Sequence, residues 1–131
     1  AGSADLVVTF RNMHNWVRAG IEATMFKAMY DVLKPGGILG LVAHRGDPDM
    51  VGIEWARKGY VPESEAVRIA EAVGFAFEGR SEINANPKDT KNYADGVWTL
   101  PPSFRRGETD KATYEAIGES DRMTLKFVKT P

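Results

Sequence analysis

The stretch Leu-Lys-Pro-Gly-Gly at residues 33–37, followed at once by Ile-Leu-Gly-Leu-Val-Ala at residues 38–43, decides how this chain folds. Proline cannot continue a helix and glycine tolerates the positive φ of a turn, so the first five residues are expected to stop a helix. The apolar run that follows is typical of a strand buried on both faces of a parallel sheet. The stretch therefore predicts a helix, a turn and a buried strand in immediate succession.

The residues before this stretch supply the helix and a second strand. Apolar side chains recur at three- and four-residue steps over residues 17–33, which predicts an amphipathic helix. Residues 5–10, Asp-Leu-Val-Val-Thr-Phe, form another short apolar run that is rich in β-branched side chains. A strand, a helix and a strand in this order predict two parallel strands joined by a right-handed crossover.

The residues after the stretch are less regular. A polar loop with one helical turn near residues 53–57 is expected first, and then a helix over residues 63–73. A strand is expected over residues 75–83, with Phe77 and Ile83 on one face. Residues 84–120 show little periodicity, and a loop of that length is usually functional or disordered. Apolar and polar side chains alternate over residues 122–129, which indicates an antiparallel strand.

Composition narrows the class of protein. The 131 residues are 43% hydrophobic and 27% charged, which predicts a single globular domain over residues 1–131, with Ala-Gly-Ser at residues 1–3 typical of a cloning remnant. The net charge of −1 gives no general attraction to nucleic acid, and the absence of cysteine excludes disulfides. No apolar run approaches the roughly 20 residues that span a bilayer, so we expect a soluble, by default cytoplasmic, protein without a membrane partner.

This order of elements resembles the C-terminal half of a class I, S-adenosylmethionine-dependent methyltransferase. The similarity covers nearly the whole chain and includes Glu-Ala-Val-Gly-Phe at residues 71–75. Asn-Pro-Lys-Asp at residues 86–89 and Asp121-Arg122 resemble a bacterial group of predicted methyltransferases without an assigned substrate. The resemblance implies an α/β fold: a partial Rossmann-like sheet of about four strands with flanking helices. The parent strands would lie in the order fourth–fifth–seventh–sixth, with the last strand antiparallel.

The resemblance also implies what is missing. The family holds S-adenosylmethionine with a glycine-rich loop after its first strand and with an acidic residue that ends its second strand. No Gly-x-Gly-x-Gly occurs in this sequence, and no strand is predicted before residue 5. We therefore expect a truncated methyltransferase domain that binds no cofactor by itself.

A missing first half would leave one strand edge open. In the family's sheet the fourth strand lies beside the first, in the middle of the sheet. The strand from Leu6 to Phe10 would here be an apolar edge with unpaired backbone groups, which favours association with another chain. Two such strands paired about a two-fold axis would form one continuous sheet, so we expect a homodimer through this strand.

The candidate site lies at the carboxyl ends of the two parallel strands, where open α/β sheets bind ligands. Residues 12–16, Asn-Met-His-Asn-Trp, follow the first strand, and His44 follows the second. Neighbouring strands lie about 4.8 Å apart, so the two histidines of the chain can face one crevice. The His-x-Trp element also resembles the His-Asp-Trp of small-molecule O-methyltransferases, whose histidine deprotonates the acceptor hydroxyl. The resemblance implies this catalytic role for His14, although Asn15 replaces the aspartate.

Further side chains are expected around this crevice. The residues predicted to bind the substrate are Asn12, Trp16, His44, Arg45 and Trp98. Other roles stay open, since His14 could cap a helix or pack against Trp16, Arg45 could be solvated, and Trp98 could anchor the long loop. His44 and Asp47 are too few ligands for a metal, so no metal site is expected.

Three functions stay open. The chain could be a fragment of an enzyme that methylates a small molecule. It could be a natural truncation that cannot methylate and serves as a dimeric binding module. It could also be one half of an enzyme whose cofactor half is another polypeptide.

Overall fold

The sheet that organises the molecule contains β1 (Ala4–Phe10), β2 (Leu33–Gly46), β5 (Arg122–Lys129) and β4 (Phe75–Ser81), in this spatial order. β1 and β2 are parallel, and β5 is antiparallel to both of its neighbours. The computed structural model describes residues 2–131, so Ala1 of the expected remnant lies outside the described residues. The order confirms the predicted fourth–fifth–seventh–sixth arrangement. A two-residue strand, β3 (Val61–Pro62), also pairs with the end of β2.

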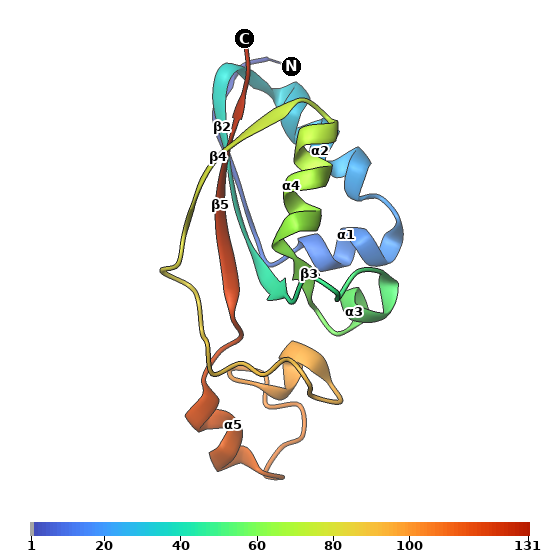
Figure 1. The fold of residues 1–131 in the computed structure, drawn as a ribbon, viewed down its shortest axis with the longest axis vertical. Helices are drawn as coiled ribbons and strands as arrows, with labels where there is room; N and C mark the ends of the chain where they lie inside the picture. The colour runs from blue at the N-terminus through green and yellow to red at the C-terminus, as the bar shows by residue number, and fades with distance from the viewer. Residues whose placement is uncertain (1) are drawn as a thin grey trace.

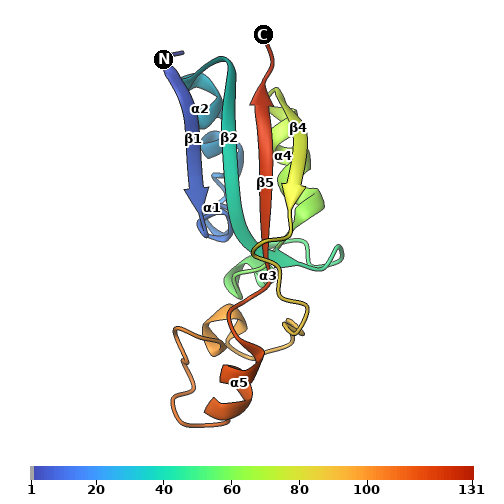
Figure 2. The same ribbon diagram turned by 90° about the vertical axis from the view of Figure 1, so that its left-hand side faces the viewer.

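The longer helices lie against one face of this sheet (Figures 1 and 2). They are α1 (Met13–Ala19), α2 (Glu22–Val32) and α4 (Glu63–Ala72), and a short α3 (Ile53–Arg57) follows the end of β2. The single helix expected over residues 17–33 is wrong. Gly20 adopts a left-handed φ of 71° and ends α1, so the chain forms two helices at an angle.

The core lies between these helices and the sheet. Leu39, Leu41 and Ala43 of β2 are at most 1% exposed, whereas the residues between them are only partly buried. The expected burial of this strand on both faces is therefore wrong, because helices cover one face alone (Figure 2). The other fully buried large side chains of this cluster are Met13, Phe26, Leu33, Met123, Leu125 and Phe127.

The uncovered face of the sheet carries apolar side chains on β1. Leu6, Val8 and Phe10 are 58%, 52% and 56% exposed, respectively. β1 pairs with β2 on one side, and no other strand among residues 2–131 pairs with its second edge. The strand from Leu6 to Phe10 is thus an open edge within the described chain.

Residues 84–120 form a separate layer beyond the carboxyl ends of β1 and β2 (Figure 1). This segment contains the 3₁₀ helix η1 (Gly96–Thr99) and α5 (Lys111–Ile117), neither of which its weak periodicity predicts. Val97 packs with Met50 and Tyr60 in a second small core. Ile83, expected on the face of β4, lies beyond the strand and is 82% exposed. No helix within residues 2–131 is long and apolar enough to cross a membrane.

Candidate functional site

A cavity of about 240 Å³ lies where the carboxyl ends of β1 and β2 meet the segment 84–120. His14 reaches it from α1, directly after β1, His44 from the end of β2, and Trp98 from η1. We call this cavity the histidine pocket. Its other lining residues are Arg11, Val97, Pro101, Pro102, Ser103, Glu119, Ser120 and Arg122.

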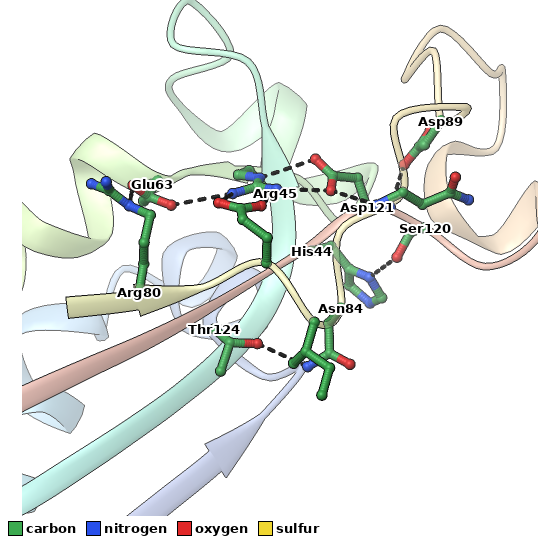
Figure 3. Close-up of polar contacts among 12 residues, drawn as sticks. His44, Arg45, Glu63, Arg80, Asn84, Asp89, Ser120, Asp121 and Thr124 are labelled. Carbon is green, nitrogen blue, oxygen red and sulfur yellow. Dashed lines mark hydrogen bonds and ion pairs between the residues drawn. The ribbon is translucent and has the colours of Figure 1, made fainter.

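The two imidazoles and the indole form one aromatic cluster. The ring centroids of His14 and His44 are 5.6 Å apart, and those of His14 and Trp98 are 5.5 Å apart with the rings nearly perpendicular. A hydrogen bond joins His44 Nδ1 to the Ser120 hydroxyl (Figure 3). The expected juxtaposition of the two histidines is therefore present in the structure, and His44 is held in one orientation by Ser120.

Burial keeps both imidazoles neutral. It lowers the pKa of His14 to about 4, with a smaller contribution from the charge of Arg18. It also lowers the pKa of His44 to about 3, assisted by the nearby charges of His14, Arg122 and Arg11. At neutral pH each ring therefore carries one N–H donor and one nitrogen that can accept a hydrogen bond.

Two buried nitrogens of this pocket have no hydrogen-bond partner among residues 2–131: His14 Nδ1 and Arg122 Nε. The guanidinium of Arg122 does contact a carboxylate, because its Nη2 lies 3.6 Å from Glu119 Oε1. Buried polar atoms in folded proteins nearly always have a partner. These two atoms are therefore unsatisfied hydrogen-bonding groups on residues that line the pocket.

Arg45 belongs to a different site, although it follows His44 in the chain. Its Nε and Nη2 donate to the two carboxylate oxygens of Asp121 at 3.0 Å each. A further hydrogen bond reaches Glu63 at 3.3 Å (Figure 3). Another reaches Glu82 at 2.8 Å, and Lys91 also contacts Asp121 at 3.1 Å. We call these five residues the arginine network.

Hydrogen bonds shift the pKa values of two members of this network, Arg45 and Asp121. The hydrogen bonds from Arg45 to Asp121 and Glu82 raise the pKa of its guanidinium above the ordinary value. Burial disfavours ionisation of Asp121, but hydrogen bonds from Arg45, the Asn86 backbone N–H and Lys91 outweigh burial and lower its pKa. Arg45 and Asp121 are thus both ionised at neutral pH and paired with each other.

The structure brings together His14, His44 and Trp98 but separates the other predicted residues from them. Arg45 faces its carboxylates, and Trp16 packs edge-on against Phe26 with the ring centroids 6.1 Å apart. Asn12 lies exposed at the start of α1, without a side-chain hydrogen bond that caps the helix. The role of each residue in binding a substrate stays a prediction.

The sequence-based prediction missed five polar residues of the pocket: Arg11, Ser103, Glu119, Ser120 and Arg122. Arg11 directly follows β1, so its place after a parallel strand is a signal that could have found it. Arg122 pairs with His44 across the β2–β5 ladder, and that register exists only in the folded sheet. Within residues 2–131 no group of three or more potential metal-ligating side chains occurs.

Comparison with known proteins identifies the fold. No family model and no curated protein matches the sequence. The structure of the [4+2]-cyclase SpnF superposes with a TM-score of 0.63 at 14% identity, over 98% of this chain and 52% of the cyclase. An S-adenosylmethionine-dependent methyltransferase from Mesorhizobium loti gives a TM-score of 0.54 at 16% identity, over 97% of this chain and 62% of that protein. A putative one from Listeria monocytogenes gives 0.55 at 10% identity, over 99% and 63%.

The chain therefore has part of the class I methyltransferase fold, and it spans between 52% and 63% of the length of these three structures. S-adenosylmethionine is the cofactor named for two of these structures. S-adenosylmethionine carries a positive sulfonium, whereas the histidine pocket is lined by Arg11 and Arg122 with Glu119 as its one acidic side chain. The described residues also lack a strand, and hence a loop after a strand, on the free edge of β1.

Proposed function

We propose that this chain is a methyltransferase-like domain whose histidine pocket binds a small molecule, and that the isolated chain does not transfer methyl groups. The observation that carries the proposal is the meeting of His14, His44 and Trp98 in one cavity at the carboxyl ends of β1 and β2. Open α/β sheets bind ligands at this position. The fold alone does not decide the reaction, since one similar structure is that of a cyclase.

His14 would act on the bound molecule through a neutral imidazole. A base with a pKa of about 4 is a weak acceptor for the proton of a hydroxyl group at neutral pH. In the isolated chain His14 therefore suits orientation of an acceptor hydroxyl through a hydrogen bond. Its proposed catalytic role, proton removal, requires a bound group that raises this pKa.

Titration calorimetry with S-adenosylmethionine tests the absence of methyl transfer by the isolated chain. We expect no binding at micromolar concentrations, because the pocket is cationic and the strand that precedes the family's glycine loop is not among the described residues. Binding with micromolar affinity would show that the chain holds the cofactor without that loop, and would contradict this part of the proposal.

Small-molecule binding is tested by ligand-observed NMR with a fragment library. We expect some fragments to bind the wild-type chain and to lose binding in Trp98→Ala, which removes one wall of the pocket. Trp55→Ala is the matched control, because Trp55 packs on the neighbouring small core but does not line the pocket. If no fragment separates the two variants, the pocket is not the binding site.

The open edge of β1 favours a second proposal, a homodimer through the strand from Leu6 to Phe10. The three apolar side chains of its uncovered face are more than half exposed in the single chain. Antiparallel pairing of two β1 strands would extend the sheet and satisfy both backbone edges. A homodimer through β1 would fit a binding module. In one half of a two-part enzyme, the open edge of β1 would instead pair with strands of the other half.

Solution mass tests this second proposal. We expect a dimer at micromolar concentration by light scattering. Val8→Lys should shift the mass towards the monomer, since like charges would then face each other across the strand pair. Ile53→Lys, at an exposed position of α3, is the control that should stay dimeric. A monodisperse wild-type monomer would remove the proposal.

A further inference from the structure

The histidine pocket is lined by two residues with buried nitrogens that lack a hydrogen-bond partner, and one of these nitrogens belongs to a permanently charged side chain. Arg122 Nε is a buried donor without an acceptor, and an arginine remains protonated at every relevant pH. A buried donor left unsatisfied costs about 1 to 3 kcal/mol. His14, only 5% exposed, adds a second unpartnered nitrogen, Nδ1, in the same cavity. An oxyanion in the cavity would accept the hydrogen bond that Arg122 cannot make within the chain.

The charges around the cavity favour an anion. Arg11 also lines it, and Arg11 makes no ion pair with any carboxylate of residues 2–131. Glu119 is the one acidic residue of the lining, and its side chain is half exposed and paired with Arg122. Two guanidinium groups against one partly solvated carboxylate leave a net positive field in the cavity.

One part of the remaining wall is apolar. Trp98, Pro101 and Pro102 line the cavity on the side of segment 84–120, and Val97 lies beside them. The guanidinium carbon of Arg105 lies over the indole of Trp98, 5.2 Å from the ring centroid, which is a cation–π contact. The volume of about 240 Å³ equals that of roughly eight water molecules at about 30 Å³ each, so it suits a single-ring organic molecule.

We propose that the histidine pocket binds a small organic carboxylate with a planar apolar body, its carboxylate at Arg122 and Arg11 and its ring against Trp98. This inference rests on the proposed function in one respect, that the pocket binds a small molecule. It names the chemical class of that molecule. A free phosphate would satisfy the arginines but leave the apolar walls without contact.

Binding of a carboxylate would also be linked to protons. The charged groups that face the two imidazoles are Arg11 and Arg18 on the side of β1 and α1, and Arg122 and Glu119 on the side of β5. A bound negative charge favours the protonated imidazole, so it raises both histidine pKa values and binding takes up protons. Affinity should therefore increase as the pH falls from about 7 to about 5, where an ordinary carboxylic acid is still largely ionised.

Calorimetry with three probes tests the proposal: benzoate, benzyl alcohol as its neutral isostere, and inorganic phosphate. We expect benzoate to bind wild-type protein about tenfold more tightly than benzyl alcohol, since one charge-assisted hydrogen bond supplies that difference. In Arg122→Gln, benzoate should bind no more tightly than benzyl alcohol. Arg11→Gln should reduce the advantage of benzoate without disturbing the fold, because Arg11 is exposed. Arg57→Gln, an exposed arginine of α3, is the control that should preserve it.

The outcomes separate this inference from the proposed function. Equal binding of benzoate and benzyl alcohol, lost in Trp98→Ala, would overturn the carboxylate proposal while the pocket remains a small-molecule site. Phosphate bound more tightly than benzoate would overturn the apolar part of the ligand and leave a plain anion site. No binding of any probe or fragment would overturn both.

Discussion

His44 and Arg45 are neighbours at the end of β2, yet their side chains enter two polar regions of opposite character. Successive side chains of a strand point to opposite faces, so the pair separates at once. In the arginine network, the guanidinium of Arg45 contacts three carboxylates, and Lys91 shares Asp121 with it. In the histidine pocket, two buried nitrogens have no partner among residues 2–131.

This difference separates a structural site from a candidate binding site. The network joins the ends of β2, β4 and β5 to α4 and to segment 84–120, and Asp89 continues it by accepting hydrogen bonds from Tyr60 and from the Asp121 backbone N–H. Its charged side chains are paired with one another, so few hydrogen-bonding groups remain free to bind a ligand. The pocket shares the same segment as its wall but keeps unused hydrogen-bonding capacity, which is the property a ligand requires.

Removal of the central carboxylate should have the largest effect. Asp121→Ala leaves Arg45 and Lys91 without their shared buried partner, and breaking such a pair typically costs about 3 to 5 kcal/mol. The free energy of unfolding from urea denaturation measures the loss. Asp5→Ala, which removes an exposed partner of Lys34, is the control with little expected effect. A loss for Asp121→Ala no greater than that of the control would show that the network does not hold the fold.

A smaller loss is expected from Gly96→Ala, which disturbs the wall that both regions share. Gly96 has a φ of 59°, and an added Cβ would lie 2.1 Å from the carbonyl oxygen of Lys58. The backbone would have to move, at a cost of about 2 to 3 kcal/mol. Gly107→Ala provides the matched control, because its φ of 63° imposes the same strain but nothing lies within 4 Å of the new atom. If the two variants have the same melting temperature, a steric clash between η1 and the Lys58 backbone is excluded as the cause of the loss.

The two regions should respond to acid in different pH ranges. The histidine pKa values are lowered by folding, so the unfolded chain binds protons first, and stability present above about pH 6.5 is lost as the pH falls. Between about pH 7 and about pH 5, wild-type protein should lose about 1 to 2 kcal/mol more than His14→Asn. The stability that Asp121 contributes through its lowered pKa is lost only when the pH falls below 3.8, the ordinary pKa of an aspartate. Parallel pH profiles of the two proteins would contradict the burial of a neutral His14.

The smallest effect is expected at the rim of the network. The side chain of Glu82 is 56% exposed, and an exposed ion pair contributes little because water and salt screen it. Glu82→Gln should leave the urea midpoint within experimental error. If Glu82→Gln lost as much free energy of unfolding as Asp121→Ala, exposed and buried members of the network would contribute equally. The distinction between its centre and its rim would then be wrong.

Local sequence patterns specified most of the regular elements and their order. The period of apolar side chains predicted the strands around residues 5–10 and 38–43, a helix near residues 63–73, and a final strand over residues 122–129 that agrees with β5 at both ends. These features depend on residues a few positions apart, so a local pattern is sufficient. The resemblance to half of a methyltransferase likewise predicted the order of strands in the sheet. The break at Gly20 was missed, because a helical pattern of apolar residues continues across it.

The partner of each polar side chain, by contrast, depends on the folded sheet. Arg45 and Asp121 are 76 residues apart, and so are His44 and Ser120. The antiparallel register of β2 and β5 ends with His44 opposite Arg122, and this brings the residues just before β5 close to His44 and Arg45. The sequence around residues 44–45 does not indicate that Arg45 contacts three carboxylates. Nor does it indicate that His44 lines a cavity with unpartnered nitrogens. Local sequence specifies which residues follow a strand, but the partners of their side chains come from distant segments, so they exist only once the sheet has formed.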